Sequence, residues 1–111
     1  MAELTVQAMT KDASLTPSFD AAAELGDTFI NDGKTFIYFK NADTVAARTI
    51  TIASQVACNQ GETHNITVTV PTESEELVGF WSQDRFNDAD GELEMTYDDH
   101  TDLTIAAIKI T

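Results

Sequence analysis

The sequence predicts an all-β protein: a sandwich of about seven antiparallel strands, immunoglobulin-like or jelly-roll in style. Three observations lead to this fold class. Polar and apolar residues alternate with a period of two along most of the chain, and threonine fills many of the outward positions. Turns that contain glycine, such as 31–34 and 88–91, separate the alternating segments. These patterns predict strands without determining their order.

The expected elements follow one another from the start of the chain. Segment 4–9 places Leu4, Val6 and Ala8 on one side and opens an extended N-terminal arm. Residues 21–25 have the composition of one helical turn, which is too short to be stable alone. Six further strands are expected over 35–40, 48–53, 65–70, 76–81, 92–97 and 103–110.

Three of these strands have one apolar face. Their outward positions carry threonine or glutamate, which indicates a solvated surface on that side. The inward positions are Ile50 and Ile52 in the second strand, Ile66, Val68 and Val70 in the third, and Leu93, Met95 and Tyr97 in the fifth.

Two strands require cover on both faces. Phe36 to Phe39 have no polar alternation, and the last strand changes its apolar parity at Ala106. Either a bulge at Ala106–Ala107 turns the strand over, or both faces are covered. A two-sheet sandwich covers only one side of a strand, so the second cover must come from loops, the N-terminal segment or another subunit.

A chain of 111 residues predicts one domain, with a strand or arm and a loop over 1–25 and the sandwich over 26–111. The single cysteine, Cys58, cannot form an intramolecular disulfide and is expected to be a small buried or half-buried apolar side chain. The first ten residues lack the pattern of a targeting segment, and no apolar run is long enough to span a membrane. We expect a soluble protein.

The charge is strongly negative, with nineteen Asp and Glu against six Lys and Arg, and a net charge of −13. Such a surface repels nucleic acid and anionic membranes, so neither is an expected partner. At about 1 M salt the Debye length falls to roughly 3 Å, which screens the self-repulsion of the chain. The composition is therefore compatible with a salt-rich, halophilic setting or with an ordinary acidic viral or bacterial surface protein.

The acidic turn 84–94 is the weak candidate for a cation site. Calcium loops alternate carboxylates before a glycine, and Asp84, Asp88 and Asp90 offer such ligands. An EF-hand is excluded, because Phe86 and Tyr97 would occupy ligand positions. A polar turn that leads into a strand is the other interpretation, and we expect no metal or other cofactor.

No catalytic constellation is visible in the sequence. The two histidines, His64 and His100, lie in no recognisable catalytic context, and Cys58 has no partner base nearby in sequence. Asn65 begins a glycosylation sequon, and in a chain rich in Asn and Thr a coincidental match is the other interpretation. The candidates for a partner surface are Trp81, Arg85 and Phe86, which lie around one loop, together with Tyr38.

Several motifs together resemble a family of small all-β structural proteins of tailed bacterial or archaeal viruses, encoded near the major capsid protein and taken to be head or decoration proteins. The resemblance rests on "GDTFINDGKTFIYFKN", "TITI", "NITVTVP" before "ELVGF", "FNDADGELEMTY" and the terminal "LTIAAIKI", and it covers 26–110. Where that family tends to carry a proline-rich stretch, this chain has Phe80-Trp81-Ser82-Gln83. That loop is therefore either more mobile or pinned by Trp81.

The resemblance implies a non-enzymatic virion structural protein: a capsid decoration, cement or turret subunit that stabilises the head of a tailed virus. It implies contact with the major capsid protein or other virion proteins, and a homo-oligomer, trimeric or pentameric. One alternative is a carbohydrate-binding or host-attachment sandwich on the virion, with Trp81 and Tyr38 as stacking platforms. Another is a head–tail connector or tail component.

Overall fold

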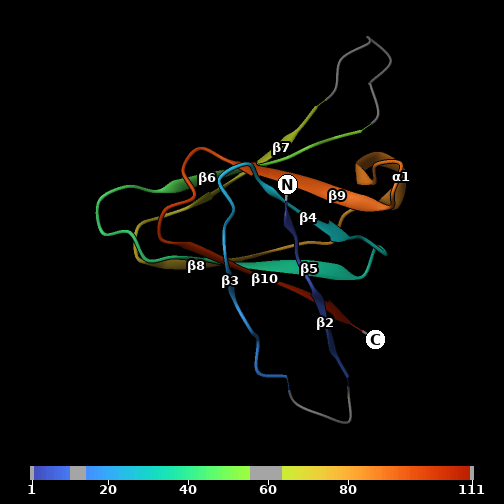
Figure 1. Ribbon diagram of the computed structural model, residues 1–111, viewed down its shortest axis with the longest axis horizontal. Helices are drawn as coiled ribbons and strands as arrows, with labels where there is room; N and C mark the ends of the chain where they lie inside the picture. Colours follow the sequence, from blue (N-terminus) through green and yellow to red (C-terminus); the bar gives the residue numbers. More distant parts are fainter. Residues whose placement is uncertain (1, 11–14, 56–63, 111) are drawn as a thin grey trace.

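The computed structural model describes residues 2–10, 15–55 and 64–110, which form two packed β-sheets. Sheet A has the strand order β1-β4-β9-β6-β7, and sheet B has the order β2-β10-β5-β8, with β3 also paired to β10. Figure 1 shows the sheets as two layers, with β9 and β6 in one and β8, β5 and β10 in the other. The elements are β1 (Ala2–Glu3), β2 (Val6–Met9), β3 (Asp20–Ala21), β4 (Asp27–Ile30), β5 (Thr35–Asn41), β6 (Arg48–Ile52), β7 (Ile66–Val70), β8 (Ser74–Val78), α1 (Gln83–Phe86), β9 (Glu92–Tyr97) and β10 (Leu103–Ile110).

The predicted fold class, an all-β sandwich, is confirmed. The additional strands β1, β3 and β4 are short and were not separately expected. Residues 21–25 form no helical turn, and the one helix of the described chain, α1, follows β8 instead. This four-residue helix is far too short to cross a membrane, and the described residues contain no longer one.

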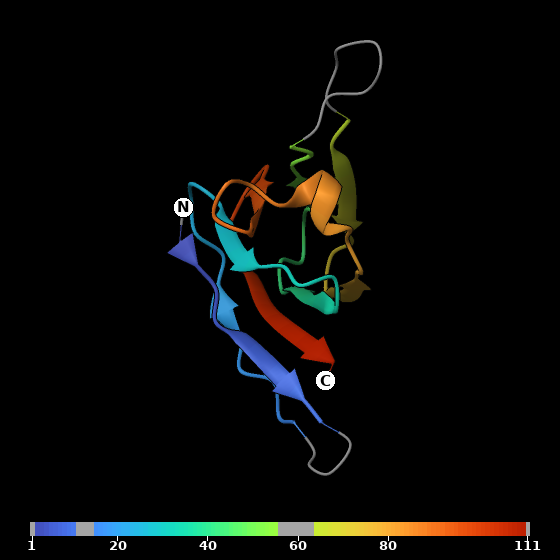
Figure 2. The ribbon, with the colours of Figure 1, turned by 90° about the vertical axis from the view of Figure 1, so that its right-hand side faces the viewer.

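The extended N-terminal arm is not confirmed. β1 pairs parallel to β4 in sheet A, and β2 pairs parallel to β10 in sheet B, so the start of the chain lies along one side of both sheets (Figure 2). Both sheets are therefore mixed rather than purely antiparallel. The reason is that Val6 lies opposite Ala107 and supplies an apolar side chain next to the core, which favours docking over extension.

The core fills the space between the two sheets. The predicted inward positions Ile50 and Ile52 of β6 and Leu93 and Met95 of β9 are fully buried, whereas Tyr97 at the end of β9 is half-buried. Ile66 and Val68 are also half-buried, because β7 is an edge strand. The largest fully buried apolar side chains are Phe29, Phe39, Ile37, Ile50, Ile52, Leu93, Met95, Leu103, Ile105 and Val70.

The bulge proposed as one alternative for β10 is absent. β10 pairs with β5 without interruption from Leu103 opposite Asn41 to Lys109 opposite Thr35. Both Ala106 and Ala107 are nevertheless buried, although they point to opposite faces. The last strand is therefore covered on both sides, which was the other alternative.

The strand expected over 76–81 is shifted, because β8 ends at Val78 and the chain turns at Gly79. A side chain at Gly79 would place its Cβ 2.7 Å from the Cβ and 2.9 Å from the Cα of Phe36. Only glycine permits this close approach to β5. After this turn the ring of Phe80 lies exposed beside Phe36, whereas the ring of Trp81 is buried in the core.

Candidate functional site

The outer face of sheet B is the candidate site. On β5, Phe36, Tyr38 and Lys40 point away from the core, since their neighbours Ile37 and Phe39 are fully buried. Residues directly opposite one another in a ladder share a face. The register therefore adds Glu75 and Leu77 from β8, Thr104, Ala106 and Ile108 from β10, and Gln7 from β2; the same parity adds Ile110 and Met9.

Two aromatic side chains from neighbouring segments cover β5 on this face. The ring of Phe80 meets Phe36 edge to face at 6.0 Å between centroids, and the ring of Phe19 meets Tyr38 in the same way at 5.1 Å. Phe36 and Tyr38 are consequently half-buried. Part of the cover that the two-sided strand requires thus comes from within the chain.

The cover is incomplete. Four of the seven exposed large hydrophobic side chains in the described part of the chain lie on this face: Leu77 is 62% exposed, Phe80 53%, Ile110 43% and Met9 38%. Phe80 and Ile110 also line a largely apolar groove of about 360 Å³ together with Gly33 and Lys34. Such clustering on one face is typical of an interaction surface.

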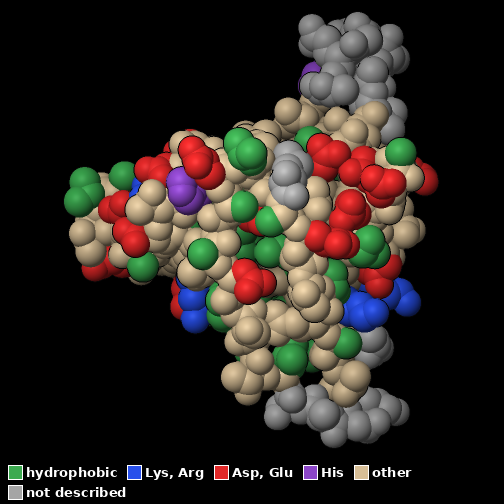
Figure 3. Space-filling model, in the orientation of Figure 1, with side chains coloured by type: hydrophobic (Ala, Val, Ile, Leu, Met, Phe, Trp, Pro, Cys, Tyr) green, Lys and Arg blue, Asp and Glu red, His purple; other side chains and the backbone are tan. Residues whose placement is uncertain are grey.

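Positive charge also collects at sheet B. The three described lysines, Lys34, Lys40 and Lys109, lie on β5, on β10 or in the turn before β5. Figure 3 shows Asp and Glu side chains over the part of the molecule that contains β4 and β9 and again at the opposite end, while most Lys and Arg side chains lie at the level of β5 and β8. Sheet B therefore brings the described lysines together with the acids of β8 and with an apolar outer face.

Lys40 occupies one end of the outer face. Its Nζ lies 4.2 Å from the centre of the Phe19 ring and 3.6 Å from a carboxylate oxygen of Glu75. The hydroxyl of Tyr38 donates a hydrogen bond of 2.5 Å to the same carboxylate, and this bond, with burial, raises the pKa of Tyr38. These contacts hold Tyr38 and Phe19 in fixed orientations on the surface.

Two of the predicted partner-surface residues are in the core instead. Trp81 is 5% exposed and packs against Phe29, and Phe86 is 4% exposed. Sequence reasoning placed both rings outside because they flank a loop. Their rings are covered within the chain, so neither ring is accessible to a partner.

The loop around Trp81 is pinned, which settles the alternative left open by the missing prolines. The buried amide of Asn31 donates to the carbonyl of Trp81 and to the Asn87 side chain. Asn87 in turn donates to the carbonyl of Asn31, as does the side chain of Gln83. The turn before β5 and the helix α1 are thereby held together by a closed polar network.

The other two candidates, Arg85 and Tyr38, lie apart. Arg85 is exposed on α1, where its guanidinium donates to the carbonyl of His64 at 2.6 Å and lies over the Phe86 ring. Tyr38 lies on the outer face of sheet B. The sequence did not identify its neighbours Phe19, Leu77 and Phe80. The apolar side chains on the outward side of β5 were the signal that such neighbours exist.

The acidic turn brings Asp88, Asp90 and Glu92 together, with one carboxylate oxygen from each within 4.8 Å of the others, and Asp84 is not among them. One oxygen of Asp88 already accepts hydrogen bonds from the backbone N–H groups of Asp90 and Glu92. These backbone bonds lower the pKa of Asp88. The geometry is that of a side chain that stabilises a tight turn, and the cation site stays a prediction.

The acids beside this turn lie close to one another and are partly buried. The pKa of Glu92 is raised by burial and by a hydrogen bond with Glu3, and the pKa of Glu94 is raised by a hydrogen bond with Asp88 and by burial. The outer face of sheet A therefore concentrates negative charge, and none of the three lysines in the described part of the chain lies on its strands.

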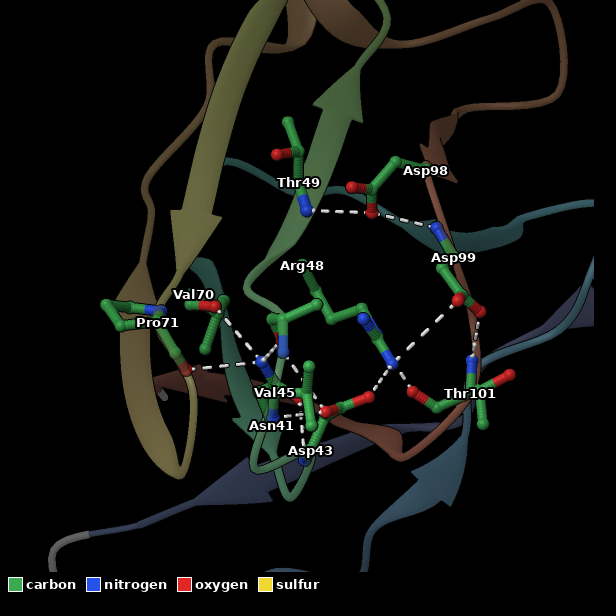
Figure 4. Close-up of polar contacts among 11 residues, drawn as sticks. Asn41, Asp43, Val45, Arg48, Thr49, Val70, Pro71, Asp98, Asp99 and Thr101 are labelled. Atoms are coloured by element: carbon green, nitrogen blue, oxygen red, sulfur yellow. Dashed lines mark hydrogen bonds and ion pairs between the residues drawn. The ribbon is translucent and has the colours of Figure 1, made fainter.

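A second polar cluster surrounds the buried side chain of Arg48 (Figure 4). Its guanidinium binds the carboxylate of Asp43 at 2.5 Å and lies 3.8 Å from that of Asp99, while its Nε donates to the carbonyl of Thr101. Backbone N–H bonds, reinforced by Arg48, lower the pKa values of Asp43 and Asp99. The cluster joins the loop after β5 to the loop before β10, and we assign it a structural role.

A part-buried hydrogen bond joins the end of β9 to the start of β4 in sheet A. The hydroxyl of Tyr97 donates to Asp27 at 2.6 Å, and Asp27 also accepts from the backbone N–H of Ala23. Burial and this bond raise the pKa of Tyr97 far above its ordinary value. The bonds fix the segment before β4, in place of the helical turn expected there.

The remaining sequence candidates supply no further site. His64 is exposed at the start of the segment that leads into β7, and Asn65 uses its side-chain oxygen to accept from the backbone N–H of Ser54. Cys58 lies outside the described residues.

Comparison of the chain with protein-family models, with curated proteins and with solved structures gives no match.

Proposed function

We propose that this chain is a non-enzymatic virion structural protein, a decoration, cement or turret subunit on the head of a tailed virus. The observation that carries the proposal is the apolar outer face of sheet B, where Leu77, Phe80, Ile110 and Met9 remain exposed around half-buried aromatic rings. A face of this kind gains free energy when a second surface removes it from water. The motif resemblance supplies the class of partner, the major capsid protein or another virion protein.

In the proposed mechanism the subunit binds only the assembled shell and stabilises it by mass action. The outer face of sheet B contacts the shell, with Lys34 and Lys40 at its margin. The acidic outer face of sheet A then points to solvent and keeps particles apart. The buried network around Asn31 and the Arg48 cluster support this use, because they hold the loops rigid and lower the entropy cost of docking.

Repeated sites on a symmetric shell favour a ring of three or five copies, so the proposal includes a trimer or pentamer. A ring requires one patch of each copy to meet a different patch of the next. The exposed side chains at the rim of the outer face of sheet B, such as Leu77 on the edge strand β8, supply one of these patches.

The test is binding of the purified protein to empty, expanded shells, followed by their thermal unfolding. Leu77→Asp and Ile110→Asp each place a charge on the proposed contact face, and we expect binding to fall by about tenfold or more. Leu25→Asp and Val45→Asp are the matched controls, because these side chains are 77% and 87% exposed and lie off that face. Equal loss of binding in all four variants, or unchanged shell stability at saturation, contradicts the proposal.

One observation favours the carbohydrate-binding alternative, namely that Phe80 is half-exposed beside a groove of about 360 Å³. The platforms first considered are weaker, since Trp81 is buried and Tyr38 is partly covered by Phe19. Glycan-array binding that disappears in Phe80→Ala would favour the alternative. A copy number of a dozen or fewer per particle would instead favour a connector or tail component.

A further inference from the structure

The edge of sheet A formed by β7 lacks the protections found at the other sheet edges. β7 pairs with β6 on one side, and no strand of the described chain pairs with its other side (Figures 1 and 2). Its sequence, Ile-Thr-Val-Thr-Val, has no charge and no proline, and its residues favour extended structure. Exposed edges of this composition readily accept another strand.

The other edges are protected. β8 carries Glu75 and Glu76, and β1 has only two residues. On the edge formed by β2 and β3, the side-chain amide of Gln7 donates to the carbonyl of Ser18 and accepts from its N–H, and β3 has only two residues. Because three edges are blunted and the fourth is not, β7 is the edge at which we expect strand addition.

We propose that β7 pairs with β7 of a second copy of this chain, antiparallel about a two-fold axis at Val68, so that the two A sheets become one continuous sheet. The sequence is self-complementary in that register. Val68 lies opposite its own copy, Thr67 lies opposite Thr69 on the outer face, and Ile66 lies opposite Val70 on the core face. Each copy thus extends the other's ladder with matching side chains.

Charge favours this partner. In a chain with a net charge of −13, β7 is an uncharged segment along which two copies can approach with little repulsion. Its ends carry opposite charge: Arg85 is bonded to the carbonyl of His64 before the strand, and the exposed Glu73 follows it. In the antiparallel pair, Arg85 of one copy lies at the end of the partner's β7 that leads into Glu73. The two-fold axis repeats this arrangement, so the pair contains it twice.

This contact does not depend on the virion role, and it uses a different surface from the outer face of sheet B. Its test therefore needs only the isolated protein. A failure of self-association through β7 leaves shell binding intact, and a failure of shell binding leaves the β7 contact intact.

The first test measures self-association by sedimentation equilibrium at about 1 M salt, where the charge repulsion is screened. We expect the mass of the wild type to rise with concentration towards that of a dimer. Thr67→Asp/Thr69→Asp places two pairs of like charges directly opposite each other, and we expect about tenfold weaker association. Thr67→Lys/Thr69→Asp places opposite charges in both pairs and should restore it.

The control is Thr44→Asp/Thr96→Asp, which adds the same net charge at exposed positions outside β7. All of these side chains are exposed, so each variant should fold, and thermal unfolding verifies that it does. A wild type that remains monomeric, or a double-aspartate variant that associates as well as the control, overturns the proposal.

The second test fixes the register. In a Cys58→Ser background, Thr67→Cys and Thr69→Cys are prepared as separate proteins. The proposed pairing places positions 67 and 69 of different copies within the Cα separation that a disulfide spans. Under mild oxidation we expect cross-linked dimers when the two proteins are mixed and few in either alone. Equal cross-linking in all three samples overturns the register.

Discussion

The two outer faces of this sandwich differ sharply although both belong to five-stranded sheets of one small chain. The outer face of sheet A carries threonine and glutamate at nearly every position, with Ile30 as the exposed exception. The outer face of sheet B carries aromatic and aliphatic side chains, with Lys40 and Glu75 at one end. One face is polar, and the other leaves apolar side chains exposed to water.

The physical reason for this difference is visible in the strands themselves. β6 and β9 alternate strictly, so each contributes to one buried face. β5 and β10 are apolar on both faces, and the fold covers their outer side with Phe19 and Phe80 from short connecting segments. Two rings cannot cover a whole sheet, and the uncovered rim is the surface to which we assign function.

The largest expected effect compares the two faces of β5. Phe39→Ala removes a ring that is fully buried between the sheets, and we expect it to lower the free energy of unfolding by about 3–5 kcal/mol. Tyr38→Ala, on the outer face, should cost about 1–2 kcal/mol, since its ring is half-buried. Urea unfolding measures both, and equal losses would mean that the outer face is also core.

The next effect concerns the turn that brings Phe80 over the outer face. In Gly79→Ala the added Cβ would lie 2.9 Å from the Cα of Phe36, and we expect a loss of about 2 kcal/mol as β5 and β8 move apart. Ser82→Ala is the control, because Ser82 is exposed and makes no side-chain cap bond to α1. Similar stability of the two variants in urea unfolding would contradict this close packing.

Lowering the pH should change the free energy of unfolding through the acids on the outer face of sheet A. The folded-state pKa values of Glu92 and Glu94 are raised, so their ionisation at neutral pH destabilises the fold, and this cost disappears as the pH falls through the raised values. The pKa values of Asp43 and Asp99 are lowered, so their contribution is present above the ordinary value of 3.8 and is lost as the pH falls below it.

The free energy of unfolding should therefore rise as the pH falls from neutral through the raised pKa values of Glu92 and Glu94, and should fall again in acid below 3.8. Urea unfolding over a pH series measures both limbs. Glu92→Gln/Glu94→Gln should flatten the rise, whereas Glu73→Gln, outside sheet A, should flatten it less. A rise that is unchanged in the double variant would show that the acids of sheet A do not cause it.

The smallest effect concerns the acidic turn at Asp88. If the Asp88 carboxylate only stabilises the turn, calcium at about 1 mM should leave the melting temperature unchanged. A calcium site with a millimolar dissociation constant would instead add about 0.4 kcal/mol to the free energy of unfolding. A saturable rise that disappears in Asp90→Asn would contradict the role of a simple turn and support a cation site.

The sequence predicted the structure correctly where a local pattern is compatible with only one structure. Strict alternation predicted the buried faces of β6 and β9, and the glycine turns at Gly33 and Gly91, both with positive φ, lie between strands as expected. It failed for Trp81 and Phe86, because the exposure of a loop ring depends on which distant segment lies beneath it. Here Trp81 packs against Phe29, and no local sequence pattern indicates this contact.

The sequence by itself determined the all-β class, the inward residues of most strands, the acidic surface and the need for two-sided cover on β5 and β10, because each follows from the period and composition of a short segment. Only the tertiary structure decided the parallel docking of β1 and β2, the rings that cover β5 and the unprotected edge at β7. Each of these depends on contacts between segments far apart in the chain, and such contacts leave no local pattern.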